Sequence, residues 1–149
     1  MRPCAVVIVA LFAATAVSAD DAKDKADEAV KQEQEKLKGK WKVVRHEFSG
    51  RIGKEAFGEP DEIKGDKWLR PQRKTAEYGL KLDPAKDPKQ VELTADRLGD
   101  KTLKGIYKLD GDKLTICYAY APDLPRPTEF KTKRGDNCYL YELERVKKD

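Results

Sequence analysis

From Trp41 onward, apolar and polar residues alternate in short runs that Gly, Pro and Asp interrupt. The runs are rich in β-branched and aromatic residues, and the interruptions come at intervals of about 8 to 12 residues, as in antiparallel barrels and sandwiches. The sequence therefore predicts an all-β fold of about eight short strands. The expected strands are Trp41–Phe48, Asp66–Arg70, Thr75–Leu82, Gln90–Thr94, Thr102–Leu109, Lys113–Ala119 and Tyr139–Val146, with a shorter one around Thr128–Thr132.

A different pattern precedes the strands, between Asp20 and Lys38. This segment is charged and rich in Ala, Glu, Gln and Lys, and it contains no Gly or Pro, so we expect a helix. Its apolar residues make only a thin stripe, which predicts a largely solvated helix that docks near Leu37 if it docks at all. A helix that binds a partner protein is the alternative.

The clearest turn signal is Asp110-Gly111, because Asp-Gly is a favoured pair for a two-residue turn between strands. A turn there sets Leu109 opposite Asp112, and side chains then alternate between two faces. The expected core face carries Leu103, Gly105, Tyr107, Leu109, Leu114, Ile116, Tyr118 and Tyr120. The outer face carries Lys104, Ile106, Lys108, Lys113, Thr115 and Cys117. The last strand places Tyr139, Tyr141, Leu143 and Arg145 inside and Cys138, Leu140, Glu142 and Glu144 outside.

The first residues have the features of an export signal. Arg2 supplies a positive start, an apolar run of 11 residues extends from Cys4 to Ala14, and Val17-Ser18-Ala19 is a small-residue cleavage site. The run is too short to span ~30 Å of hydrocarbon as a helix, which disfavours an uncleaved anchor. We expect a secreted or periplasmic protein with a signal peptide at 1–19, a charged helical leader at 20–38 and one barrel domain at 39–149.

Charged residues make up 39% of the chain, but Lys and Arg are interleaved with Asp and Glu, and the net charge is only +4. No basic run with interspersed aromatic residues resembles a nucleic-acid reader. The sequence thus predicts no binding to nucleic acid and no stable membrane insertion once the signal is removed. We expect a monomer.

Signal cleavage would also remove Cys4 and leave Cys117 and Cys138 as an even pair. In an oxidising compartment such a pair is expected to form a disulfide, and both residues fall on the outer face of the predicted strands. Two free thiols and a redox-active pair are the alternatives. The redox pair is disfavoured because the spacing is not C-x-x-C and no histidine lies nearby.

Few residues suggest catalysis or metal binding. His46 is the only histidine and could act as a general base, but no nucleophile motif accompanies it, so a surface or lumen residue is the preferred interpretation. Asp110-Gly111-Asp112 resembles part of a calcium loop but lacks further spaced oxygen ligands, and turn formation explains it. We therefore expect no catalytic residue, no metal site and no cofactor.

Five tyrosines are expected to point into the barrel, namely Tyr107, Tyr118, Tyr120, Tyr139 and Tyr141. Their apolar rings and polar hydroxyls could line a pocket for a small, partly apolar molecule. The alternative is that they fill the interior, since a barrel of about eight strands is just wide enough to be filled or to hold one small ligand.

Gly39-Lys40-Trp41, at the start of the first strand, resembles the G-x-W motif of lipocalin-like barrels. The resemblance implies that Trp41 plugs the closed end of the barrel beneath an arginine at the end of the last strand, a position that Arg145 holds here. A stacked contact of this kind stabilises by roughly 0.5 to 2 kcal/mol. Any ligand would then enter at the opposite, open end.

Four longer strings resemble a family of small exported proteins described as the planctomycete uncharacterised, lipocalin-like domain. They are LKGKWKVV at 37–44, LDPAKDPK at 82–89 leading to ELT at 92–94, GIYKLDGD at 105–112, and PRPTEF at 125–130. The match extends from Leu37 to Arg145 and implies a lipocalin-like antiparallel β-barrel without an established activity. The charged leader and Cys138 depart from the family's pattern, which weakens the case for a disulfide.

Together these features predict an exported, non-enzymatic lipocalin-like barrel that binds a small, partly apolar molecule in its lumen. The alternative is a protein-interaction or inhibitor module acting through exposed loops, chiefly 121–136 with Arg126 and Phe130, or through the N-terminal helix. An enzyme of the barrel-hydrolase or isomerase kind is disfavoured because no paired base and nucleophile is evident. A cavity above about 300 Å³ would favour the first hypothesis, and a filled barrel with an exposed apolar loop patch would favour the second.

Overall fold

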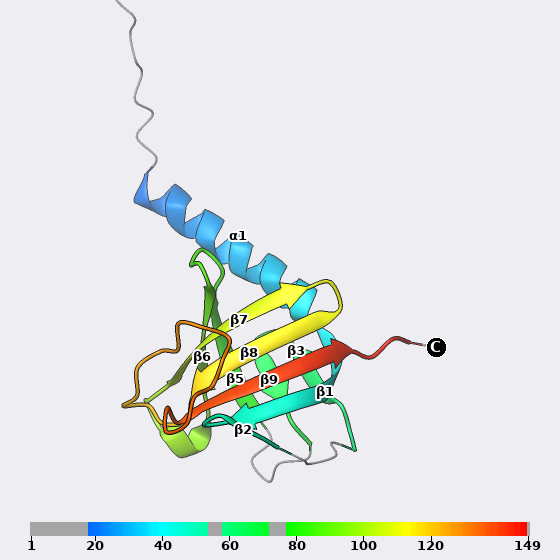
Figure 1. Cartoon of the computed structure of the whole chain (residues 1–149). Helices are drawn as coiled ribbons and strands as arrows, with labels where there is room; N and C mark the ends of the chain where they lie inside the picture. Colours follow the sequence, from blue (N-terminus) through cyan, green and yellow to red (C-terminus); the bar gives the residue numbers. More distant parts are fainter. Residues whose placement is uncertain (1–17, 54–57, 72–76, 149) are drawn as a thin grey trace, which may run out of the picture.

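One antiparallel sheet closes on itself to form a barrel, with a helix leading into it (Figure 1). The computed structural model describes residues 18–53, 58–71 and 77–148. Its elements are α1 (Ala19–Leu37), β1 (Gly39–Phe48), β2 (Arg51–Ile52), β3 (Asp61–Lys64), β4 (Lys67–Leu69), β5 (Glu77–Asp83), β6 (Lys89–Thr94), the 3-10 helix η1 (Asp96–Leu98), β7 (Leu103–Asp110), β8 (Lys113–Ala119) and β9 (Cys138–Arg145). The predicted signal peptide lies outside the described residues except for Ser18, the N-cap of α1, and Ala19.

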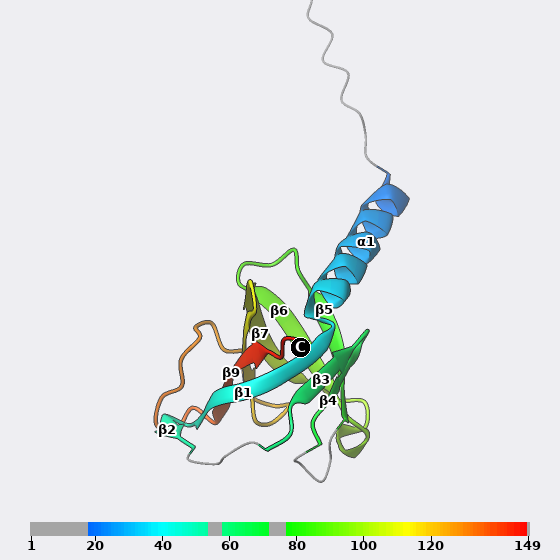
Figure 2. The same ribbon diagram turned by 90° about the vertical axis from the view of Figure 1, so that its right-hand side faces the viewer.

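The barrel closes because β1 pairs with both β3 and β9. Figure 2 shows β1 lying between these two strands. The order around the barrel is β1-β3-β4-β5-β6-β7-β8-β9, while β2 forms only a short hairpin with the end of β1. All pairings are antiparallel, so the predicted all-β barrel of eight strands with a preceding helix is confirmed.

Two details of the predicted strands are wrong. Residues 128–132 form no strand and belong to the irregular segment between β8 and β9. The eighth barrel strand is β3, whose single buried apolar residue, Ile63, gives too weak an alternation to predict. Residues 75 and 76, at the start of another predicted strand, lie outside the described residues.

The turn between β7 and β8 also differs from the prediction. Asp110 pairs with Lys113, so Gly111 and Asp112 form the loop, and Leu109 lies opposite Leu114 rather than Asp112. This register differs from the predicted one by two residues. Because the side-chain period of a strand is two, every side chain stays on its predicted face.

Buried side chains form a lumen core and a smaller outer cluster. The lumen core contains Leu37, Trp41, Val43, Ile63, Trp68, Tyr78, Leu80, Leu82, Val91, Leu93, Leu103, Tyr107, Leu114, Ile116, Tyr118, Tyr141 and Leu143. The outer cluster contains Ile106, Cys117, Cys138 and Leu140, with Phe130 packed against it. The two clusters match the two predicted faces of β7, β8 and β9.

The end of α1 closes one end of the barrel around Trp41, which is fully buried. The Trp41 indole Nε1 donates a hydrogen bond of 2.8 Å to the Leu37 carbonyl, and the Arg145 guanidinium carbon lies 4.3 Å from the indole centroid. Arg145 also donates to the carbonyls of Lys36 and Lys38, at 2.6 and 2.8 Å. The last carbonyls of a helix lack partners within the helix, so Arg145 caps α1 while it covers Trp41. The predicted Trp–Arg contact is confirmed.

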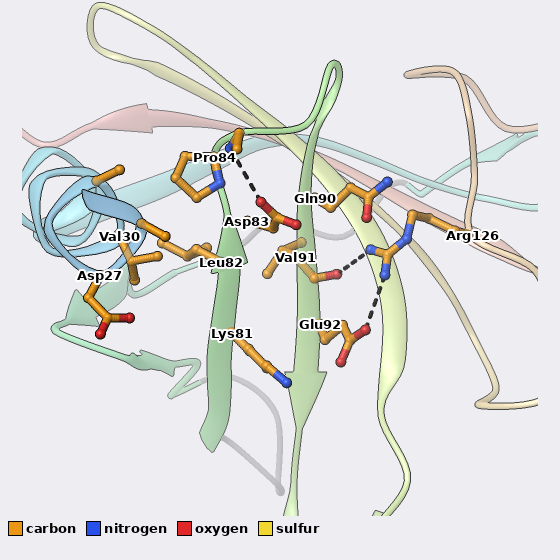
Figure 3. Close-up of a pocket in the computed structure, with 13 residues that line it drawn as sticks. Asp27, Val30, Lys81, Leu82, Asp83, Pro84, Gln90, Val91, Glu92 and Arg126 are labelled. Carbon is orange, nitrogen blue, oxygen red and sulfur yellow. Dashed lines mark hydrogen bonds and ion pairs between the residues drawn. The ribbon is translucent and has the colours of Figure 1, made fainter. Parts of the chain in front are cut away.

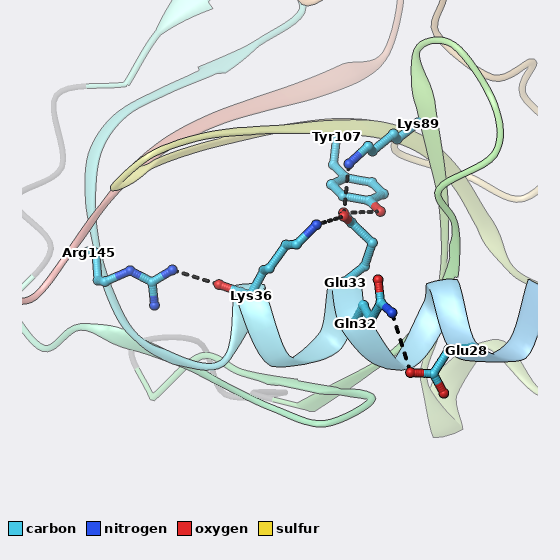
Figure 4. Close-up of polar contacts among 7 residues, drawn as sticks. All are labelled: Glu28, Gln32, Glu33, Lys36, Lys89, Tyr107 and Arg145. Atoms are coloured by element: carbon cyan, nitrogen blue, oxygen red, sulfur yellow. Dashed lines mark hydrogen bonds and ion pairs between the residues drawn. The ribbon is translucent and has the colours of Figure 1, made fainter.

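Glu33 connects α1 to the interior of the barrel (Figure 4). Its carboxylate accepts a hydrogen bond of 3.1 Å from the Tyr107 hydroxyl and pairs with Lys89 and Lys36 at 2.9 and 3.1 Å. Burial on its own would raise the pKa of Glu33, but the hydrogen bonds from Lys89, Lys36 and Tyr107 outweigh it and lower the pKa. The N-terminal part of α1 is exposed and projects away from the barrel (Figure 1). The helix docks through its C-terminal part, where Val30, Glu33 and Leu37 contact the barrel, which is a longer contact than the predicted one near Leu37.

We predict that Arg145→Ala lowers the free energy of unfolding by about 2 kcal/mol, because it removes the cation–π contact and two charge-assisted hydrogen bonds. Trp41→Ala should cost more, about 3–5 kcal/mol, since it also leaves a cavity. Lys147→Ala, at an exposed position nearby, is the control and should change stability by less than about 0.5 kcal/mol. Chemical denaturation followed by circular dichroism measures all three, and an Arg145 variant as stable as the control would exclude the plug.

We also predict that acid weakens the docking of α1 through Glu33. Because its folded pKa lies below the unfolded value, Glu33 contributes stability above about pH 4.3, and the contribution is lost as the pH falls through the folded pKa. Glu33→Gln should therefore be less stable than the parent at pH 7 and should lose less stability on acidification. Glu28→Gln, at an exposed position of the same helix, should follow the parent; equal pH profiles for all three proteins would contradict this role.

Candidate functional site

The open end of the barrel, opposite α1, holds a cavity of about 160 Å³. Its lining residues are Arg70, Tyr78, Arg97, Leu103, Tyr118, Tyr120, Tyr139 and Tyr141. Four of the five tyrosines predicted to bind a ligand are in this set. Tyr107 is not, because its hydroxyl is bonded to Glu33 at the closed end. The cavity is smaller than the volume of about 300 Å³ that would have favoured ligand binding over a filled barrel.

Tyrosines from β8 and β9 form one wall of the cavity. Tyr118 and Tyr139 face each other across the two strands, and the Tyr118 and Tyr141 rings stack with centroids 6.0 Å apart and planes at 11°. Gly105 on β7 makes room for this wall, since a Cβ there would lie 2.8 Å from that of Tyr118. Tyr120 is 56% exposed, and its ring centroid lies 5.9 Å from that of Tyr139. The aromatic surface therefore extends from the core to the rim of the barrel.

Arg70, just after β4, is a buried cation in the cavity and is only 3% exposed. Its Nε donates to Asp61 Oδ2 at 3.1 Å, and the same oxygen accepts from the Trp68 indole at 3.0 Å. Its guanidinium carbon lies 4.5 Å from the Trp68 centroid and 4.2 Å from that of Tyr141. Burial lowers the pKa of Arg70, but Tyr118, Tyr141 and Asp61 raise it by more, so the guanidinium stays charged.

Arg97, in η1, is a second cation of the cavity and is exposed. Its Nη2 donates to the Tyr78 hydroxyl at 2.7 Å, and its guanidinium carbon lies 5.5 Å from the Tyr78 ring centroid. Unlike Arg70, it makes no ion pair with an acid in the part of the chain that the structure describes. Within that part no carboxylate lines the cavity either.

Tyr118 is one of three buried tyrosines that line the cavity, together with Tyr78 and Tyr141. Burial raises the pKa of Tyr118 well above its ordinary value, and Tyr141 raises it further, so the phenol is neutral. The hydroxyl has no hydrogen-bond partner among residues 18–53, 58–71 and 77–148. A bound molecule can therefore be its partner.

Sequence reasoning missed both arginines. A signal for Arg70 existed, because alternation along Trp68-Leu69-Arg70 places Arg70 on the same face as the buried Trp68. Arg97 gives no such signal, since it lies in a 3-10 turn without a strand period.

His46 points into the lumen, one of the two positions that were expected. The register of β1 against β9 shifts between Val43 and Arg45, and this bulge turns His46 toward the interior. Its ring stacks on Tyr141, with centroids 5.7 Å apart and planes at 15°. Among the described residues, no group of three or more His, Cys, Asp or Glu is placed to hold a metal ion.

Cys117 and Cys138 are free thiols, which corrects the predicted disulfide. Cys117 lies opposite Leu140 and Cys138 opposite Ala119, so the cysteines are diagonal neighbours. Diagonal positions are about 7–8 Å apart, whereas the Cα atoms of a disulfide are usually about 4.4–6.8 Å apart. Burial, together with Cys138, Asp136 and Glu47, raises the pKa of Cys117 to about 12, so this thiol stays protonated.

A larger groove of about 410 Å³ lies between α1 and the β5–β6 hairpin (Figure 3). Its apolar residues include Val30, Leu82 and Val91, and acids and bases both lie among them. Arg126 is already engaged there, because it donates to the carbonyls of Val91 and Gly105 and pairs with Glu92 at 3.2 Å. The groove thus offers no aromatic wall and no uncommitted guanidinium, and the open-end cavity is the better candidate site.

The loop between β8 and β9 packs on the outer face of the barrel. Phe130 contacts the outer cluster, and the Lys108 Nζ lies 4.7 Å from the centroid of its ring. The Thr132 hydroxyl donates to Glu47 at 2.8 Å. Within 121–136 no large apolar side chain is exposed, so this loop lacks the apolar patch expected of an interaction module.

Comparisons of the chain with protein-family models, with curated proteins and with solved structures find no match. No helix within the described residues is long and apolar enough to cross a membrane. The case for the site therefore depends on the geometry of the cavity.

We predict that Cys117 and Cys138 are both reduced in the folded protein and react slowly with a thiol reagent until the chain is unfolded. The reason is their diagonal placement and their burial. Alkylation in denaturant without reductant, followed by peptide mass mapping, should label both residues. A fall in melting temperature on addition of a reductant would show a disulfide and contradict the prediction.

Proposed function

We propose that this protein binds a small, partly apolar molecule in the tyrosine-lined cavity at the open end of its barrel and does no chemistry on it. We also propose that it is an exported member of the lipocalin-like family that its motifs resemble. The closed barrel and the Arg145 contact with Trp41 support the family proposal. The observation that carries the function is the cavity itself, in which stacked rings and two guanidiniums converge.

The aromatic wall supports binding rather than simple filling of the core. Ligand pockets are mostly apolar with a few polar groups that orient the ligand, and this cavity combines stacked rings with Arg70, Arg97 and the Tyr118 hydroxyl. Its rings become more exposed from Tyr118 through Tyr139 to Tyr120, so a ligand has apolar contact along its path. The volume of about 160 Å³ limits the ligand to a small molecule.

The lining residues favour binding without catalysis. Nucleophilic catalysis needs a nucleophile within hydrogen-bond reach of a base, and the cavity's polar side chains are arginines and tyrosines. The interaction-module alternative is less well supported, because Arg126 and Phe130 are both committed to contacts within the fold.

Native mass spectrometry of the protein purified from its own envelope tests this proposal, and we predict that it retains a small molecule. Tyr120→Ala, at the rim, should raise the Kd of that molecule about 5-fold, as expected for one lost aromatic contact of about 1 kcal/mol. Val44→Ala, at another exposed apolar position on β1, is the matched control and should bind like the parent.

The carrier proposal fails if the barrel is repeatedly recovered empty and a panel of metabolites leaves its melting temperature unchanged. Equal effects of Tyr120→Ala and Val44→Ala on ligand affinity would place the ligand elsewhere on the molecule.

A further inference from the structure

The charges and hydrogen-bond donors of the open-end cavity indicate what kind of molecule it binds. We infer that the cavity selects a small aromatic anion, with a carboxylate held by Arg97, Tyr78 and Tyr118 and a ring stacked on the tyrosine wall. This inference rests on the proposed function and names the class of ligand.

The first argument is charge balance. Arg70 is compensated by Asp61, which is itself only 3% exposed and 3.1 Å away. Arg97 has no such partner within the described residues, and the neighbouring acid Asp96 forms no ion pair with it there. The cavity lining therefore carries a net positive charge among the described residues, which favours an anionic ligand over a neutral or cationic one.

The second argument is hydrogen-bond type. A guanidinium has five N–H donors and no acceptor, and the contact of Arg97 with Tyr78 uses Nη2. Since the Tyr78 oxygen accepts that bond, its own proton can be donated to a ligand. The Tyr118 hydroxyl is neutral and has no partner in the described part of the chain. Arg97, Tyr78 and Tyr118 can thus each donate a hydrogen bond to a ligand in the cavity. A carboxylate suits them because it only accepts hydrogen bonds.

The third argument concerns the ring. Tyr118, Tyr139 and Tyr141 present parallel or tilted faces with centroids 5.5 to 6.0 Å apart. Aromatic pairs prefer stacked or edge-to-face contacts at such distances, so a flat ring gains more here than a flexible chain of equal size. The small cavity volume restricts the ligand to about one ring.

The test compares benzoate with its neutral analogue benzamide and with acetate, by calorimetry on the full exported protein. We expect benzoate to bind at least about 10-fold tighter than either of the others, as one hydrogen-bonded charge pair would give. Arg97→Gln should raise the Kd of benzoate about 10-fold and change that of benzamide less than about 2-fold. Arg134→Gln, an exposed arginine on the outer loop, is the matched control and should leave both unchanged.

The outcomes separate this inference from the carrier proposal. The inference that the ligand is an anion is wrong if benzoate and benzamide bind equally, or if the Arg97→Gln variant binds benzoate like the parent. Either result leaves the carrier proposal standing. If acetate binds as tightly as benzoate, the inference that the ligand carries an aromatic ring is wrong. If none of the three binds while native mass spectrometry recovers another ligand, the inference is wrong and the carrier proposal holds.

Discussion

A barrel of eight strands encloses a lumen only about wide enough for its own side chains, and this limit decides where the molecule has room for anything else. At the closed end the space is taken by Trp41, Tyr107 and Leu37, with α1 above them. Arg145 holds that arrangement by covering Trp41 and capping the helix. In the described part of the chain, the open end keeps a small cavity, and flat tyrosine rings line it.

The strands of the second half of the chain are predictable because their alternation is strong and the turn at Gly111 fixes their relation. An error of two residues in that turn left Tyr107 and Cys117 on their correct faces, since a face depends only on whether the shift is even or odd. The disulfide needed more than the correct face. It required two cysteines directly opposite each other, and the observed register places Cys138 opposite Ala119.

The first half of the chain is less predictable for a different physical reason. Strand β3 is four residues long and contains one buried aliphatic residue, Ile63. It is a strand because β1 and β4 lie on either side of it and provide backbone partners once the barrel closes. The tyrosines of the site are predictable because the two-residue alternation along β8 and β9 places them on the lumen face. Arg70 is not, because a charged residue is expected in solvent unless its buried partner, here Asp61, is known.

Two of the buried charged clusters in the described part of the chain serve different purposes. Glu33 meets Lys36 and Lys89 at the edge of the barrel, where both lysines remain partly exposed, and it fastens the helix. Asp61 and Arg70 are both almost fully buried, and a buried pair of this kind often adds little net stability compared with apolar residues of similar size. Its effect here is positional, because Asp61 fixes the guanidinium against the Trp68 and Tyr141 rings. Because the guanidinium lies within 4.5 Å of both ring centroids while Trp68 and Tyr141 contact each other edge to face, the pair places a fixed positive charge beside the aromatic wall of the cavity.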